Sequence, residues 1–244
     1  MTRAIKYEPI SVEYIGHMGS DKRVVNCART SFAKWEDESI ELTPKDIGLL
    51  AYLATGLKKD EREDWQKRVK TATHFAPYCH NFLTVRVAVP IFLARQLHKH
   101  TVGLIISEES RRYIDDVNLY LPNELHYAPE NAKQGASDQV FDKSMLLNGF
   151  EVPPIEVINT VTQSSVQTYY SLLEAGIAPE EARMVLPLNS VVHWVWSGSL
   201  LAFIRVFKQR IDPHAQLAAQ EFAGHLGKII HDKFPESFNA LVNI

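Results

Sequence analysis

The stretch NFLTVRVAVPIFLARQLHKHTVGLIISEESRRY (residues 81–113) predicts a buried strand, a helix and a charged segment in immediate succession. Residues 81–89 are rich in β-branched side chains, which favour a buried strand. Pro90 ends this strand and opens a helix over residues 90–100, which Gly103 terminates. The apolar residues 104–106 then lead into the charged segment 107–112. This succession favours an α/β fold.

The rest of the chain adds more helix than strand. Residues 8–17 alternate apolar and polar side chains and predict a second strand, and residues 110–121 predict a third. Helices are predicted from Thr43-Pro44 to Gly56, from Pro153 to Gly176, from Pro179, over residues 196–209, and from Asp212-Pro213 to Ile230. No repeat or composition break divides the chain, so residues 1–244 are predicted to form one α/β (α+β) domain whose C-terminal half is rich in helix.

Composition excludes several classes of protein. The 244 residues are 45% hydrophobic and 23% charged, as in globular proteins, and the net charge of −3 gives no overall attraction to nucleic acid or anionic lipid. Two cysteines, Cys27 and Cys79, fit a reducing compartment. The N-terminus lacks a signal pattern, and no apolar run reaches the roughly 18 residues of a membrane helix. We therefore expect a cytoplasmic protein, in the host cytoplasm if a phage encodes it.

The end of the predicted 90–100 helix is the first candidate site. Gln96, Lys99 and His100 stand at positions i, i+3 and i+4, so they share one helix face. Taken alone, Lys99 and His100 are expected to solvate the helix end, where cations suit the helix dipole. A ligand-binding role gains support from the segment that follows.

Residues 107–112 bring two hydroxyls, two carboxylates and two guanidinium groups into six positions. Arginine matches phosphate oxygens in a bidentate fork, and serine or backbone N–H groups complete such a cradle. The alternative is a charged turn whose members pair with one another. Arg183 and Arg210 also stand beside apolar sequence, so each is expected to meet a carboxylate or an anionic ligand.

Other kinds of site are not favoured. His98 and His100 would lie on nearly opposite sides of a helix, and the chain has no Cys-x-x-Cys or His-Glu-x-x-His spacing, so we expect no metal. It also lacks a P-loop and a Gly-x-Gly-x-x-Gly motif. Cys79 is interpreted as an apolar filler rather than a nucleophile.

Together these segments resemble the flavin-dependent thymidylate synthase family, whose signature is Arg-His-Arg, seven or eight residues, then Ser. The corresponding run here is Lys99-His100-Thr101, eight residues, then Ser110. The resemblance spans most of the chain: His74, Pro77 and His80 match an upstream segment, and EARMVLPL and the DPHAQ segment after Arg210 match the C-terminal half.

Several positions depart from the family pattern. Lys99 and Thr101 replace two arginines of the signature, and Ala76 and Cys79 stand where a hydroxyl residue and a carboxylate often occur. Ser199 and Leu201 stand where members often have Asn and Arg. The Lys-His-Thr variant resembles a phage-type branch of the family.

The resemblance implies the fold, the reaction and the site. It implies a mixed central sheet flanked by helices, and a homotetramer whose active sites are shared between subunits. Arg210 is implied as the catalytic residue, lying against the uracil and stabilising negative charge at N3. The implied nucleotide-binding residues are Gln96, Lys99, Glu108, Glu109, Ser110, Arg111, Arg112, Arg183 and Arg210. The implied flavin-binding residues are Ala76 (from another subunit), Lys99, His100, Thr101, Glu108, Ser199, Leu200, Leu201 and Arg205.

The implied activity is the methylation of dUMP to dTMP, with methylenetetrahydrofolate as carbon donor, FAD as cofactor and NADPH as reductant. No protein nucleophile is needed, which agrees with a site made of Arg, Gln, Glu and Ser. Two alternatives remain open: another pyrimidine C5 modification, such as hydroxymethylation or action on a cytidine nucleotide, and a nucleotide-binding protein without catalysis.

Overall fold

An antiparallel sheet with strand order β2-β3-β8-β4 forms the centre of the computed structural model, which describes residues 4–62, 72–130 and 135–242. Its strands are β2 (Ser11–Met18), β3 (Phe82–Pro90), β4 (Leu104–Glu108) and β8 (Val191–Ser199). The long pair is β3 with β8, in register from Phe82 opposite Ser199 to Pro90 opposite Val191. The strands predicted over 8–17 and 81–89 are therefore confirmed as β2 and β3.

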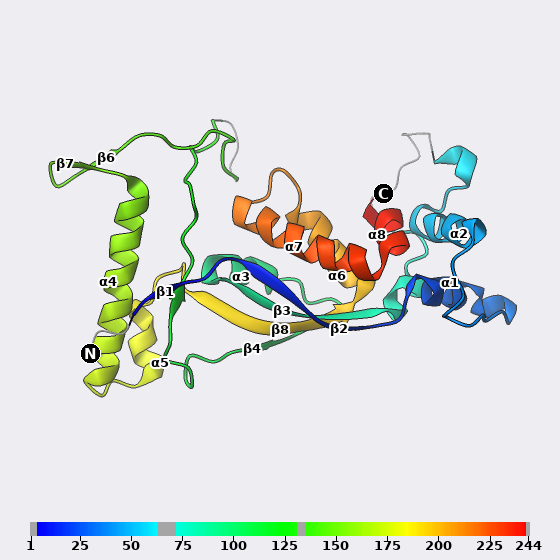
Figure 1. Cartoon of the computed structure of the whole chain (residues 1–244), viewed down its shortest axis with the longest axis horizontal. Helices are drawn as coiled ribbons and strands as arrows, with labels where there is room; N and C mark the ends of the chain where they lie inside the picture. Colours follow the sequence, from blue (N-terminus) through cyan, green and yellow to red (C-terminus); the bar gives the residue numbers. More distant parts are fainter. Residues whose placement is uncertain (1–3, 63–71, 131–134, 243–244) are drawn as a thin grey trace.

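Helices cover one face of this sheet. Figure 1 shows α6 and α7 along that face, and α8, α1 and α2 at the end of the sheet where the C-terminus is marked. Trp196 of β8 joins the layers, with ring centroids 5.5 Å from Phe203 of α6 and 6.3 Å from Phe222 of α7. The bounds are α1 (Asp21–Arg29), α2 (Pro44–Thr55), α3 (Ile91–Leu97), α6 (Leu200–Arg210), α7 (Leu217–Lys233) and α8 (Pro235–Val242). Short 3-10 turns are η1 (Thr30–Phe32), η2 (Lys59–Glu61), η4 (Ala76–His80) and η5 (Arg183–Val185).

A second, smaller cluster of apolar residues lies around α4 (Pro154–Glu174), which stands across one end of the sheet (Figure 1). There α4 meets α5 (Pro179–Ala182) and the parallel pair β1 (Lys6–Tyr7) and β5 (Asn118–Leu119). A hairpin of β6 (Met145–Leu147) and β7 (Phe150–Val152) precedes α4. The buried members of the cluster are Val117, Leu119, Val166, Tyr169, Tyr170 and Ala182. The expected α/β fold with a helix-rich C-terminal half is confirmed, and its parallel pairing lies in β1 and β5 rather than in the four-stranded sheet.

The structure corrects four boundaries. Residues 191–199 form β8 because Val191 to Ser199 pair along all of β3, and the predicted 196–209 helix begins only at Leu200, capped by the Ser199 hydroxyl. Residues 104–108 form the strand β4, because they find a partner in β8, whereas only Asn118–Leu119 of the predicted 110–121 strand form a strand, β5. The helix after Pro90 ends at Leu97. The last predicted helix starts at Leu217 and is followed by a separate helix, α8. Among the described residues no helix is long and apolar enough to cross a bilayer.

The buried carboxylate of Asp46 provides a stability prediction. Asp46 and Thr43 form a reciprocal capping box at the start of α2, and Lys22 and Arg29 lie 3.2 and 2.5 Å from its carboxylate. Burial alone raises the pKa of Asp46, but the Thr43 hydrogen bonds, Lys22 and Arg29 together lower it to about 2. Since this folded-state pKa lies below the unfolded value, the carboxylate stabilises the fold above about pH 4, and this is lost as pH falls toward 2.

Replacing this carboxylate, Asp46→Asn, is therefore expected to lower the free energy of unfolding by about 2 kcal/mol at pH 7. The measurement is urea unfolding at pH 7 and at pH 3, where the difference between the variant and the parent protein should shrink. Asp138→Asn, at an exposed position, serves as the matched control. A loss of stability that is equal at both pH values would contradict the role of the charge.

Candidate functional site

The loop after α3 carries three of the residues expected at the flavin: Lys99, His100 and Thr101. β3 leads through Pro90 into α3, whose first backbone N–H donates to the Ser190 carbonyl at 2.9 Å. α3 ends at Leu97, and the ring of the next residue, His98, packs against Trp194 with the centroids 4.8 Å apart. The chain then reverses toward α6. Lys99 and His100 therefore stand outside the helix, and the face predicted to join them to Gln96 does not form.

His100 holds the guanidinium of Arg210. The Nε and Nη2 atoms of Arg210 lie 3.2 and 2.9 Å from Nε2 of His100. Arginine only donates, so this imidazole nitrogen accepts and the ring proton resides on Nδ1. Burial and the neighbouring Arg210 charge both lower the pKa of His100, which keeps the ring neutral. Arg210 is thus oriented by a partner that leaves its positive charge uncompensated.

A cavity of about 320 Å³ opens beside this pair. Its lining combines cationic side chains with apolar ones. The lining residues are Lys99, His100, Thr101, Val102, Leu104, Ala202, Arg205, Gln209 and Arg210. Within the described part of the chain, no carboxylate forms an ion pair with Arg210. Burial lowers the pKa of Arg210, so its partly desolvated guanidinium suits an anionic or strongly polarised ligand.

A second cavity, of about 760 Å³, adjoins the first at Gln209 and Arg210. Its wall includes Gln96, whose side-chain amide donates to the Gln216 side chain at 2.6 Å. The other lining residues are Lys208, Asp212, His214, Ala215 and Gln216. Arg210 therefore stands between two cavities, one lined by the 99–104 loop and one by Gln96 and the turn before α7.

The predicted phosphate cradle forms a compact turn after β4, the 110–112 turn. Arg112 donates from Nε to the Ser110 hydroxyl at 3.1 Å, and its exposed guanidinium lies over the ring of Tyr113, 5.4 Å from the centroid. Arg111 instead donates to two backbone carbonyls, those of Asp116 and, at 2.7 Å, Val191. Arg111 therefore anchors the turn to β8, and Arg112 is the arginine that faces outward.

The sheet divides the expected nucleotide residues into two groups. Side chains alternate along β4, so Glu108 lies on the helix-covered side, 4.0 Å from His98, while Glu109 lies on the open face beside His193. Arg210 belongs to the helix-covered side through α6. In the described part of the chain, no hydrogen bond or ion pair joins the 110–112 turn to Gln96, Lys99, His100 or Arg210. Within one chain the expected nucleotide residues thus form two separate groups, which are called half-sites below.

Other expected residues lie outside these cavities. Ala76 is exposed at the start of η4, and Arg183 is exposed beside α4, with its Nε donating to the Glu180 carbonyl at 3.2 Å. The Ser199 hydroxyl accepts from the Ala202 backbone N–H at 3.3 Å and so caps α6. Leu200 and Leu201 are buried in the core.

The cavities also contain residues that the sequence analysis missed. Ala202 and Gln209 share a face of α6 with Arg205, at positions i−3 and i+4, so helical spacing could have found them. The residues from Asp212 to Gln216 precede α7; the family resemblance covers this segment, but no periodic signal marks it as part of a site.

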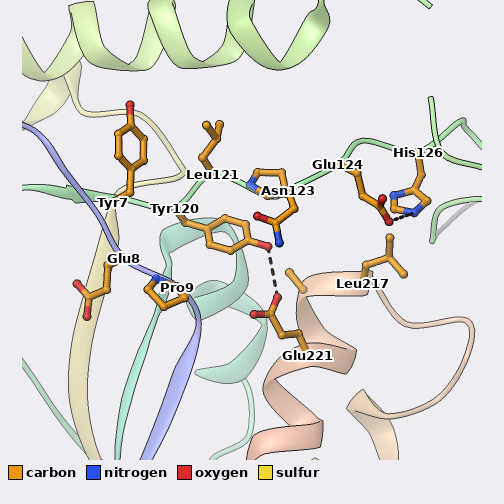
Figure 2. A pocket seen from close by; sticks show the side chains of 12 residues that line it. Tyr7, Glu8, Pro9, Tyr120, Leu121, Asn123, Glu124, His126, Leu217 and Glu221 are labelled. Atoms are coloured by element: carbon orange, nitrogen blue, oxygen red, sulfur yellow. Dashed lines mark hydrogen bonds and ion pairs between the residues drawn. The ribbon is translucent and has the colours of Figure 1, made fainter. Parts of the chain in front are cut away.

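A third cavity, of about 700 Å³, lies between the start of α7 and the segment after β5 (Figure 2). Tyr120 donates to Glu221 across it at 3.4 Å, and burial together with Glu221 raises the pKa of Tyr120 to about 12. Glu8 and Glu124 also line it, and no lysine or arginine is among its described lining residues. This cavity is therefore unsuited to a phosphate.

Comparison with known proteins adds an independent result. The model of the thymidylate synthase complementing protein (Thy1) family matches residues 13–236. A flavin-dependent thymidylate synthase of Thermotoga neapolitana is 32% identical over 95% of this chain and 90% of its own length. The enzyme of the same name from Thermosipho africanus is 29% identical over 92% of this chain and 87% of its own length.

Solved structures show the same fold. A UMP/dUMP methylase, PolB, from Streptomyces cacaoi bound with 5-Br dUMP superimposes with a TM-score of 0.72 at 24% identity, covering 97% of this chain and 96% of that one. Its structure with 5-Br UMP gives a TM-score of 0.73 at 22% identity, covering 99% of each chain.

Proposed function

Because the chain belongs to the thymidylate synthase complementing protein (Thy1) family, we propose that it catalyses the reductive methylation of dUMP to dTMP. One observation supports this assignment above all. Arg210 carries a half-buried positive charge between two cavities, is oriented by a neutral histidine, and has no carboxylate partner among the described residues. This is the arrangement required to stabilise negative charge that develops on a bound uracil ring.

The proposed chemistry assigns a task to each group on the helix-covered side. Arg210 donates toward the uracil edge at N3 and stabilises negative charge there, which makes C5 a better carbon nucleophile. His100 keeps the guanidinium aimed through its Nε2 acceptor. Gln96 and Lys99 supply hydrogen-bond donors, and methylenetetrahydrofolate supplies the carbon. The 110–112 turn holds the phosphate, with Arg112 as its outward-facing cation.

The two cysteines agree with a route that uses no protein thiolate. Burial raises the pKa of the Cys79 thiol, although Arg205 and Ser199 oppose this shift. Burial also raises the pKa of the Cys27 thiol. Both side chains therefore stay protonated near neutral pH and are poor nucleophiles.

The residues around the smaller cavity fit FAD. Lys99 and Arg205 offer cations for its phosphates, and Val102, Leu104 and Ala202 offer an apolar surface for its ring. When bound, the flavin supplies the electrons of the reduction, and NADPH restores them. A cavity of about 320 Å³ holds only part of such a cofactor, so further contacts, including Ala76, come from other subunits in this proposal.

The two half-sites support a homotetramer with shared sites as part of the proposal. The open face of the sheet exposes Phe82 (43%), Ile105 (76%) and Val195 (38%), which the strand register places on one side. Apolar patches of this kind mark contact surfaces between chains. A second chain packed on this face would cover it, and the proposal is that each complete site combines the 110–112 turn of one chain with the Arg210 half-site of another.

One observation favours a second candidate, another C5 modification of a pyrimidine nucleotide. The Ser199 hydroxyl caps α6 and Leu201 is buried, so neither provides the polar contacts that Asn and Arg provide in the family pattern. Mass spectrometry after incubation with dUMP, UMP or dCMP separates the candidates. Methylated dUMP as the end product supports the main proposal, and a hydroxymethyl end product overturns it.

The decisive experiment is the visible absorption spectrum of the purified protein, followed by an assay of NADPH oxidation. We expect a yellow protein, or one that takes up added FAD, and NADPH oxidation that depends on dUMP. A colourless protein that neither takes up FAD nor oxidises NADPH with dUMP present would instead indicate a binding protein without catalysis.

A further inference from the structure

His193 lies between two carboxylates on the open face of the sheet, next to the 110–112 turn. Its Nε2 is 2.8 Å from Oε1 of Glu8, and its Nδ1 is 3.1 Å from Oε2 of Glu109. The imidazole is only 16% exposed. The Nε2 contact with Glu8 is a hydrogen bond, whereas Nδ1 lies against the Glu109 carboxylate without hydrogen-bond geometry.

Each carboxylate has a second attachment. The Asn118 side-chain amide donates to Oε2 of Glu8 at 2.6 Å, and Nη2 of Arg86 donates to Oε1 of Glu109 at 3.2 Å. Figure 2 shows the Glu8 carboxylate turned away from the third cavity, although the residue lines it. Together these contacts form a continuous row of polar side chains from Asn118 through Glu8, His193 and Glu109 to Arg86. This polar row connects β5, β8 and β3 to the end of β4.

This polar row ends at the start of the 110–112 turn, which is also attached to β8. The Glu109 backbone N–H donates to the His193 carbonyl at 2.9 Å, and Arg111 donates to the Val191 carbonyl at 2.7 Å. Ser110 therefore lies between two attachments to β8. A small cavity beside His193 is lined by Glu109, Ser110 and Arg111, so the ring is in direct reach of the turn.

The negative charge of Glu109 gives His193 a second effect on the 110–112 turn. Glu109 places a negative charge next to the residue expected to bind phosphate, which weakens anion binding unless a cation compensates it. Arg86 donates to one oxygen of Glu109, and the imidazole Nδ1 of His193 lies against the other. Loss of the imidazole removes one of these contacts and frees the carboxylate to turn toward the phosphate.

We propose that His193, supported by Glu8, is a positioning residue that fixes Glu109 and the 110–112 turn in the conformation that binds the nucleotide phosphate. The inference rests on the proposed function, because it takes the phosphate of a pyrimidine nucleotide as the ligand of the turn. It predicts that His193 governs binding of the nucleotide and leaves the chemistry at the uracil ring to Arg210.

The test compares steady-state kinetics and calorimetric dUMP binding for the full-length protein and its variants. We expect His193→Ala to raise KM and Kd for dUMP by about tenfold or more with kcat nearly unchanged, since it removes a hydrogen bond to the Glu8 carboxylate and the side chain that lies against Glu109. Glu8→Gln, which leaves the imidazole in place, should produce a smaller increase in the same direction. His225→Ala, at an exposed histidine of α7, is the matched control and should behave as the parent protein.

A charge-specific rescue distinguishes positioning from general structural damage. Adding Glu109→Gln to His193→Ala removes the uncompensated carboxylate, so dUMP affinity should recover in part. Unchanged KM and Kd in His193→Ala, or no recovery in the double variant, overturns the inference while the proposed function stands. A parent protein that binds dUMP but does not methylate it overturns the proposed function alone, because the Kd comparison still tests His193. A parent protein that does not bind dUMP overturns both.

Discussion

Arg210→Ala is expected to lower kcat for dUMP methylation by roughly 10²- to 10³-fold, the usual cost of removing a charge-stabilising donor from an active site. The guanidinium is half-buried, bonded to His100 and unpaired with any described carboxylate, so its charge is available to the substrate. The helix itself should remain intact, because alanine is the best helix former and the residue ends α6. Single-turnover rates with saturating dUMP measure the effect, and circular dichroism checks the fold.

Two further variants make this result specific. Arg95→Ala removes an exposed arginine of α3 and should leave kcat unchanged. Arg210→Lys keeps a cation but loses the planar fork that donates from Nε and Nη2 to His100, so it should recover only a small part of the activity. Full activity in Arg210→Ala would refute the catalytic role, as would an equal loss in Arg95→Ala.

Mixing two inactive variants is expected to restore activity if the half-sites come from different chains. Arg210→Ala removes the arginine of the half-site on the helix-covered side. Arg112→Ala removes the outward-facing arginine of the 110–112 turn. In randomly mixed oligomers, about a quarter of the sites then combine an intact Arg210 from one chain with an intact Arg112 from another. Co-expression with two different tags, tandem purification and the dUMP-dependent NADPH assay measure the restored fraction.

The control for this experiment pairs Arg210→Ala with the double variant Arg210→Ala/Arg112→Ala, in which no chain supplies Arg210. That mixture should stay as inactive as its components. Mixed oligomers of the two single variants that show no activity above this control would mean that both arginines serve a site within one chain. Such a result would refute the shared site and leave the assignment of Arg210 untouched.

Local signals in the sequence were reliable where a segment's own residues decide its conformation. Thr43-Pro44 predicted the start of α2, and the structure shows the capping box formed with Asp46. The β-branched run after Asn81 predicted β3 for the same reason, since its apolar side chains alternate into the core. The prediction of a helix from residue 196 was wrong for residues 196–199, because an apolar run fits a core helix as well as a buried strand until a partner strand is known. Pairing with β3 decided the matter.

The candidate site, like the fold, was predictable from the sequence in part and was otherwise set by the tertiary structure. By itself the sequence determined the residue types of the 99–101 loop and the 110–112 turn, since the signature spacing and the Ser-Arg-Arg cluster can be read along the chain. Only the tertiary structure decided that Arg111 is occupied by backbone carbonyls while Arg112 faces outward. It alone paired Arg210 with His100, 110 residues apart in the chain. It also placed Glu108 on the helix-covered side and Glu109 on the open face, and so separated the 99–101 loop from the 110–112 turn, because alternation along β4 and packing against β8 are properties of the assembled strands.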